Sequence, residues 1–222
     1  MKQTLRTIIF LLMATVAIAA AAKPRGLANV YMKNGTEYTG VEIKCPNGWD
    51  DKIQFKDGET KYKVKSDSIE HMEIWHEANP DNKVYLIWSD WTTWDAKKDK
   101  FDKVRTKDRK WFSLEAAGDN LAYWMSITNV KPGKKSISMN VTASPHFLLK
   151  RGSNLLIYIP YGAKRSITLN WLGAYLGDDE VLAEDILNEK YFDRKQATRQ
   201  GTIHNSFLIE DICKDYTPGR KK

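Results

Sequence analysis

The chain has 222 residues and a formal net charge of +7, from 35 basic and 28 acidic residues. This length can bury one substantial core or two small ones. Basic and acidic side chains alternate through residues 97–110 instead of forming one cationic block. We therefore expect a solvated loop there, and we expect no nucleic-acid partner.

The first 22 residues have the pattern of a cleavable secretory signal peptide. Lys2 and Arg6 give a cationic start, residues 8–22 carry no ionisable side chain, and Ala20-Ala21-Ala22 supplies small residues for a cleavage site. A helix of about fifteen residues rises about 22 Å, less than a hydrocarbon core of roughly 30 Å. We expect cleavage after Ala22, a mature chain without a transmembrane anchor that starts near Lys23, and a periplasmic or secreted location.

Residues 23–77 have the pattern of a small β-barrel domain. Asn34-Gly35 separates two strand-like segments and is the preferred pair for a type I′ hairpin, because both positions need a positive φ. Further segments alternate apolar residues with lysines or acidic residues. We predict strands at 30–33, 36–43, 52–56, 61–65 and 69–75 that close into an SH3- or Sm-like barrel.

Residues 78–110 break this pattern and predict a linker with a charged loop. Asn79-Pro80-Asp81-Asn82 interrupts the strands, although residues 84–88 can form one more. From Trp111 the β pattern returns in segments separated by turn residues, which favours an antiparallel meander. The predicted strands span 111–116, 121–128, 136–142, 147–150 and 155–159.

The C-terminal part of the chain predicts helices. Residues 167–176 place leucines on one face and end at Gly177, after which Asp178 can cap a second helix. A third helix follows Asn205 or Ser206, and residues 218–222 form a basic tail. Strands followed by helices predict an α+β fold, in which residues 111–217 form a meander plus helices.

Five stretches of the chain share the pattern of one group of proteins. They are VYMKNGTEYTGVEIK (30–44), KYKVKSDSIEHMEIW (61–75), FLLKRG (147–152), YLGDDEVLAEDILNEKYF (175–192) and FLIEDICKDYTP (207–218). The last three resemble a group of exported proteins of Bacteroidetes-type bacteria without an established function. The first two resemble the small barrel that often precedes that region. The resemblance implies an exported compartment and this fold, and it carries no active-site residues.

A tryptophan repeat is the best candidate for a binding surface. Trp88, Trp91 and Trp94 recur at three-residue spacing, and exposed indoles can stack on sugar rings or anchor a protein partner. The alternative is that these tryptophans fill the gap between barrel and sheet, because large aromatic residues usually belong to the core.

The remaining motif searches favour no metal, cofactor or catalytic site. His71 and His76 point to opposite faces of a strand, and His146 and His204 have no neighbouring nucleophile. The acidic run at 178–185 is explained by a helix N-terminus, where carboxylates complement the dipole. The sequence contains no G-x-S-x-G elbow, phosphate-binding glycine loop, H-E-x-x-H or C-x-x-C.

These patterns together predict an exported binding or envelope-associated interaction protein without catalytic activity, whose partner is an envelope protein or a glycan. The alternative is a hydrolase with a carboxylate site in the C-terminal part, which requires two carboxylates within about 10 Å in one pocket. A disulfide between Cys45 and Cys213 stays open, because the two residues lie near opposite ends of the mature chain.

Overall fold

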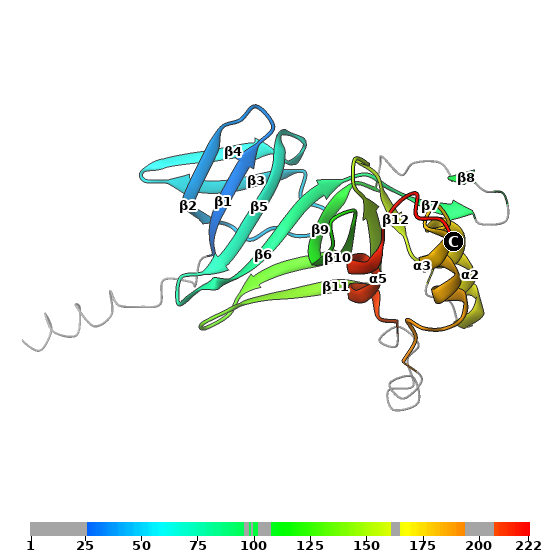
Figure 1. The fold of residues 1–222 in the computed structure, drawn as a ribbon. Coiled ribbons are helices and arrows are strands. Elements are labelled where there is room, and N and C mark those ends of the chain that lie inside the picture. The colour runs from blue at the N-terminus through cyan, green and yellow to red at the C-terminus, as the bar shows by residue number, and fades with distance from the viewer. Residues whose placement is uncertain (1–25, 96–97, 99, 102–107, 161–164, 194–206) are drawn as a thin grey trace, which may run out of the picture.

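The computed structural model describes residues 26–95, 98, 100–101, 108–160, 165–193 and 207–222. Within these ranges the chain is mostly β-sheet, with three helices near the C-terminus, so the α+β class is confirmed (Figure 1). Twelve strands join in one open, mixed sheet in the order β4-β3-β2-β1-β5-β6-β9-β10-β11-β12-β7-β8. Their bounds are β1 Gly26–Met32, β2 Glu37–Ile43, β3 Lys52–Asp57, β4 Thr60–Lys65, β5 Ile69–His76, β6 Asn79–Ser89, β7 Trp91–Asp95, β8 Lys100–Phe101, β9 Lys110–Ala117, β10 Leu121–Pro132, β11 Ile137–Lys150 and β12 Leu156–Tyr158.

The first two strands form the hairpin that the sequence predicted, with a different turn. Gly35 has a φ of +85°, whereas Asn34 is not among the residues with positive φ, so the turn is not type I′. The Asn34 side chain instead accepts a hydrogen bond from the Thr36 N–H at 3.0 Å. The backbone bond from Met32 N–H to Thr36 O then closes the loop at 2.8 Å.

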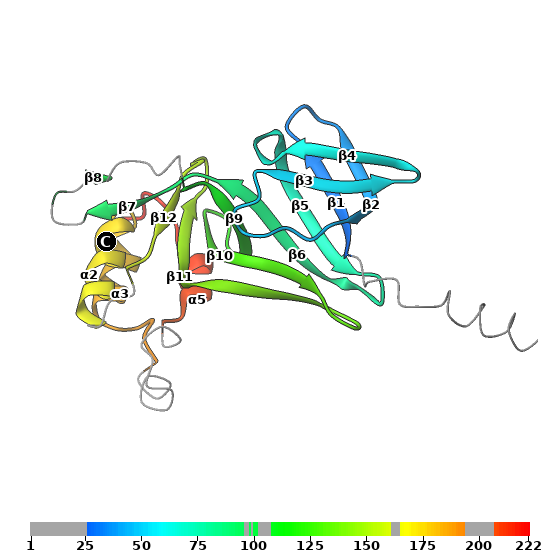
Figure 2. The same cartoon turned by 180° about the vertical axis from the view of Figure 1, so that it is seen from behind.

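The predicted closed barrel in the N-terminal part is not confirmed. One edge of β5 pairs with β1 and the other pairs with β6, so β5 has no edge left for β4. Strand β6 instead carries the sheet onward to β9 (Figure 2). The core between the N-terminal strands is completed by Trp111, Ile127 and Val130, which lie on β9 and β10. The first five strands therefore share one core with the second half of the chain.

The segment predicted as a linker, residues 78–110, carries the three strands β6, β7 and β8 of the sheet. The strand expected at 84–88 lies within β6, and β7 and the short β8 follow it. Strand β7 pairs in parallel with β12, through Leu156 opposite Trp91, so the sheet is mixed and not a pure antiparallel meander. Residues 96–97, 99 and 102–107 of the predicted charged loop lie outside the described part of the chain.

Three helices pack against β10, β11 and β12. They are α2 (Arg165–Tyr175), α3 (Glu180–Leu187) and α5 (Ile209–Asp215). Their buried residues form one core with Leu121, Leu148 and Ile157 of the strands. None of these three helices combines the length and the apolar character that a membrane crossing needs.

Neither of the two cysteines is in a disulfide. Cys45 packs beside the N-terminal core, whereas Cys213 belongs to the helical core. Burial raises the pKa of the Cys45 thiol to about 11 and that of Cys213 to about 12. Both thiols are therefore protonated and unreactive at neutral pH.

A buried carboxylate fixes the C-terminal tail to the start of α3. Asp179, not the predicted Asp178, is the N-cap residue, and its side chain accepts a hydrogen bond from Leu182 N–H at 3.1 Å. The fully buried Asp179 also accepts two bonds of 2.8 Å from Arg220 and one from Thr217 N–H. Burial alone would raise the pKa of Asp179, but these hydrogen bonds hold its pKa below the usual value.

We predict that Asp179→Asn lowers the free energy of unfolding by about 3 kcal/mol at pH 7, because Arg220 loses its charged partner. Asparagine is also a good N-cap residue, so the change isolates the charge. Because the pKa of folded Asp179 is depressed, its contribution is present above the unfolded pKa and is lost as the pH falls through the folded pKa. The free energies of unfolding of the two proteins, measured in urea, should therefore begin to approach each other below about pH 4 and become equal only below the folded pKa of Asp179.

The matched control is Asp185→Asn, which breaks the more exposed ion pair with Lys190. This change should cost less than about 1 kcal/mol. Equal losses from the two variants would contradict the anchoring role of Asp179.

Candidate functional site

The connection between β2 and β3 crosses β10 at a glycine. Gly48 N–H donates to Thr128 O at 2.8 Å, and Gly48 O accepts from Trp111 N–H at 2.8 Å. A Cβ at position 48 would lie 1.9 Å from Ile127 O, so only glycine permits this approach. The crossing thereby fixes where the next side chain, Trp49, leaves the backbone.

Trp49 stands at the mouth of an open pocket of about 470 Å³ between β7, β9, β11 and β12. Its side chain is 56% exposed, the highest value among the large hydrophobic residues in the described part of the chain. The pocket is lined by Trp49, Trp91, Thr93, Lys110, Thr142, Ala143, Phe147 and Tyr158.

Trp91 forms a rigid wall of this pocket. Its ring meets Phe147 edge-on at 5.5 Å between centroids and Tyr158 at 6.4 Å. Its indole N–H donates to Asp108 O at 3.2 Å. Such edge contacts hold an aromatic face in a fixed orientation that a flat ligand could use.

Lys110 is a buried lysine within this aromatic pocket. Its side chain Nζ lies 4.9 Å from the ring centroid of Trp91, 5.4 Å from Phe147 and 5.6 Å from Phe112. Only 9% of the residue is exposed, so the last residue of the predicted solvated loop, 97–110, is buried. Burial lowers the pKa of the Lys110 ammonium, while the negative charge of Asp108 opposes the shift.

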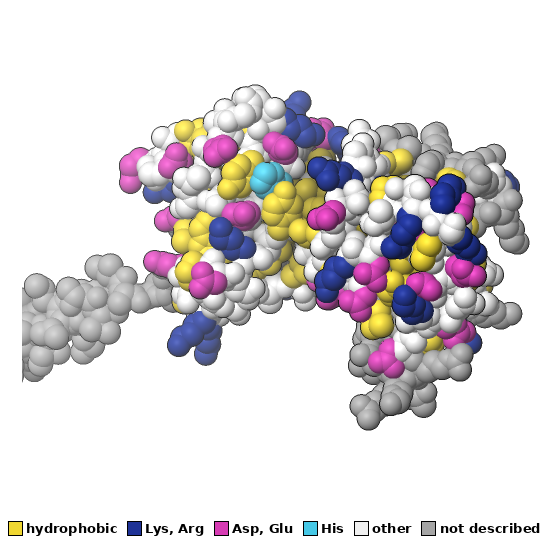
Figure 3. Space-filling model, viewed as in Figure 1, with side chains coloured by type: hydrophobic (Ala, Val, Ile, Leu, Met, Phe, Trp, Pro, Cys, Tyr) yellow, Lys and Arg dark blue, Asp and Glu magenta, His cyan; other side chains and the backbone are white. Residues whose placement is uncertain are grey.

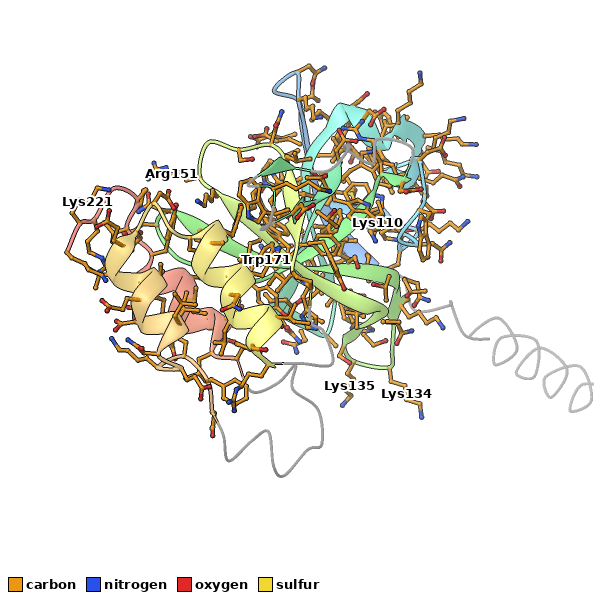
Figure 4. The ribbon with its side chains drawn as sticks, turned by 90° about the vertical axis from the view of Figure 1, so that its right-hand side faces the viewer. Lys110, Lys134, Lys135, Arg151, Trp171 and Lys221 are labelled. Carbon is orange, nitrogen blue, oxygen red and sulfur yellow. The ribbon has the colours of Figure 1, made fainter. Side chains whose placement is uncertain are left out.

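Strand alternation explains why a lysine ends up buried here. Lys110 and Phe112 are two residues apart on β9 and contact each other, so they share one face. Trp111 points to the opposite face, where it is fully buried in the N-terminal core and donates its indole N–H to Asp50 O at 3.1 Å. Figure 4 shows Lys110 among the strands, whereas Lys134 and Lys135 extend from the β10–β11 turn.

The three predicted tryptophans do not form one surface. Trp91 and Trp94 belong to the same strand but to different clusters, because Trp94 packs edge-on against Tyr175 of α2 at 6.3 Å. Trp88 lies against Trp111 and donates its indole N–H to Asp67 at 2.9 Å. All three are half-buried, and only Trp91 lines the pocket.

Sequence reasoning missed Trp49 and Lys110, the two residues that complete this pocket. A tryptophan after a glycine in a turn-rich connection was a usable signal, because core aromatic residues usually lie within strands or helices. Lys110 gave no such signal, since it follows a run of alternating charges.

The histidines within the described ranges form no shared site. His71 stacks between Tyr31 at 4.2 Å and Tyr85 at 4.9 Å. His76 accepts a hydrogen bond from Ala78 N–H at 3.0 Å, away from that stack. His204 lies outside the described residues. Across the described ranges, no three His, Cys, Asp or Glu residues are grouped as metal ligands.

The C-terminal carboxylates are ion-paired. Glu180 and Glu184 line one pocket of about 470 Å³, but they bind Lys221 at 2.6 Å and Lys222 at 2.9 Å. The hydrogen bond from Lys221 lowers the pKa of Glu180. A glycosidase acid needs a raised pKa instead, so this pair does not suit acid catalysis.

Two further surfaces have aromatic side chains. Tyr31, His71 and Tyr85 form an aromatic stack on β1, β5 and β6. Figure 3 shows a histidine among hydrophobic side chains over the N-terminal strands. A groove of about 710 Å³ near the β4 edge has Phe55 and Tyr62 in its lining and lysines around them. Lysines on an edge strand also prevent pairing with other chains, so the groove has a structural explanation.

No protein-family model, no curated protein and no solved structure matches this chain.

We predict that Gly48→Ala lowers the free energy of unfolding by about 3 kcal/mol or more, because the methyl group collides with the β10 backbone. The control is Gly58→Ala, where open space surrounds the added methyl and only the φ of +55° is unfavourable. That control should cost about 1 kcal/mol. Urea unfolding measures both, and an equal cost for the two variants would disprove the tight crossing.

Proposed function

We propose that this protein is an exported, envelope-associated binding module that recognises glycans through the pocket of Trp49 and Trp91. The observation that carries the proposal is the exposed indole of Trp49 at the mouth of a recess whose wall is a second indole. Sugar rings have apolar faces that pack on aromatic rings, and exposed aromatic residues of this kind mark binding sites.

The shape of the site supports a glycan over a protein partner. Its volume is within the range of small-ligand pockets, roughly 300–1,000 Å³. A standard protein interface instead buries about 800 Å² on each partner and needs a broad apolar centre. Four large hydrophobic residues are exposed in the described part of the chain, and of these only Trp49 lines this pocket. Val141 lies on β11, whereas Ile167 and Leu187 lie on the helices.

Export is supported by the residue pattern of the first 22 residues and by the resemblance to exported Bacteroidetes-type proteins. An extracytoplasmic location would give the pocket access to cell-surface and environmental glycans. Both parts of the proposal can be tested separately.

We predict that Trp49→Ala weakens glycan binding about tenfold, because one stacking face is lost. Isothermal titration calorimetry should be run with the mature protein against hexaoses of glucose and of galacturonate and their charged or esterified forms. The control is Ile167→Ala, which removes another exposed apolar side chain, 49% exposed, on α2. The proposal fails if no probe binds, or if the two variants bind alike.

We predict that the protein isolated from its native host starts at or near Lys23, because a signal peptidase removes residues 1–22. N-terminal sequencing of the protein from envelope, culture and cytosolic fractions measures this. A cytosolic protein that begins at Met1 would contradict export, and it would leave the binding test unaffected.

A further inference from the structure

We infer that the pocket takes a negatively charged glycan, whose carboxylate or sulfate group pairs with Lys110. The inference rests on the proposed glycan-binding function and names the chemical class of the ligand. Lys110 is a buried cation that no acidic residue of the described chain neutralises.

Lys110 forms no ion pair and no hydrogen bond through its side chain with any described residue, although it is nine-tenths buried. The neighbouring Arg109, by contrast, is bound to Asp67 and also to Asp90 at 2.9 Å. Buried charges are ordinarily paired, because removing a charge from water is costly. A lysine left unpaired beside an ion-paired arginine needs an explanation other than general stability.

The aromatic rings around Lys110 account for only part of this cost. Trp91, Phe112 and Phe147 present their rings to the ammonium at 4.9–5.6 Å, and such cation–π contacts stabilise the charge. An aromatic ring does not replace a full hydrogen-bond acceptor for the three N–H groups of a lysine. The ammonium therefore keeps its capacity to bind an anion.

The remaining lining of the pocket fits an anionic ligand. The residues that line it include one cation, Lys110, and no carboxylate. The nearest acidic influence on Lys110 is Asp108, an exposed residue whose carboxylate is not part of the lining. An anion that enters would meet a positive charge set among aromatic rings, where charge pairing is stronger than in bulk water.

The aromatic and cationic groups would bind different parts of the ligand: the indole would contact the sugar ring, and the ammonium would pair with the acid group. Trp49 is the exposed member of the lining, and Lys110 is a largely buried member. A sugar ring that stacks on Trp49 could direct a substituent acid group inward. This arrangement suits a uronic acid or a sulfated sugar better than a neutral one.

The test uses pairs of ligands that share one sugar backbone and differ in whether it carries charged groups. Hexagalacturonate is compared with its methyl ester, and sulfated maltohexaose with maltohexaose, by calorimetry on the full mature protein. The charged member of at least one pair should bind about tenfold more tightly, as a charge-assisted hydrogen bond contributes. The pair that shows this difference identifies the anion as carboxylate or sulfate.

Lys110→Met should abolish this preference, so that the charged and the neutral member of the pair bind the variant with affinities that agree within about twofold. Lys131→Met is the control, because it makes the same change of net charge at an exposed position of β10. Since the ligand pairs are compared on the unaltered protein first, the result does not depend on whether Lys110→Met folds.

The possible outcomes separate the inference about charge from the proposed glycan binding. Equal binding of charged and neutral members overturns the inference and leaves glycan binding intact. A charge preference that survives Lys110→Met or is lost in Lys131→Met also overturns it, because the anion is then attracted elsewhere. Absence of binding by every ligand removes the proposed function and the inference together.

Discussion

The crossing of residues 46–49 over β10 is the constraint on which the rest of the structure depends. Backbone hydrogen bonds at Gly48 join the β2–β3 connection to β9 and β10, and Ser66 closes the same region by donating its hydroxyl to Asp50 O at 2.6 Å. These contacts bring the N-terminal strands against Trp111, whose indole completes their core. The same crossing determines the position of Trp49, so the fold and the candidate site have one origin.

Successive side chains of β9 point to opposite faces of the sheet, so this strand contributes both to the N-terminal core and to the aromatic pocket. Trp111 enters the N-terminal core, while Lys110 and Phe112 face the aromatic pocket. A lysine at this position costs stability, because burial opposes its charge. Costs of this kind are concentrated at functional sites, which is why an unpaired buried cation beside an open pocket points to a ligand.

Local sequence patterns predicted most of the strands and helices and little of their assembly. Alternating residues and turn pairs located β1 to β5, since these signals depend on neighbours in the chain. A closed barrel would need β4 to pair with the second edge of β5. That edge pairs with β6 instead, and no local pattern indicates this choice. The choice of Asp179 over Asp178 as a cap likewise depends on Arg220, far along the chain.

The candidate site was predictable only in part for the same reason. Trp91 could be proposed as a binding residue from its spacing, but Trp88 and Trp94 belong to other clusters. Trp49 and Lys110 join Trp91 through the Gly48 crossing and the β6–β9 pairing, neither of which leaves a local pattern.

The most direct measurement is the indole region of a ¹H–¹⁵N NMR spectrum of the mature protein during titration with hexagalacturonate. Eight tryptophans give eight indole N–H signals, and those of Trp49 and Trp91 should shift in proportion to saturation. The signal of Trp171, buried and bonded to Trp94 O at 3.0 Å, should stay in place. A spectrum in which Trp49 and Trp91 do not move at saturating ligand, or in which other indoles move instead, would contradict the assignment of this pocket.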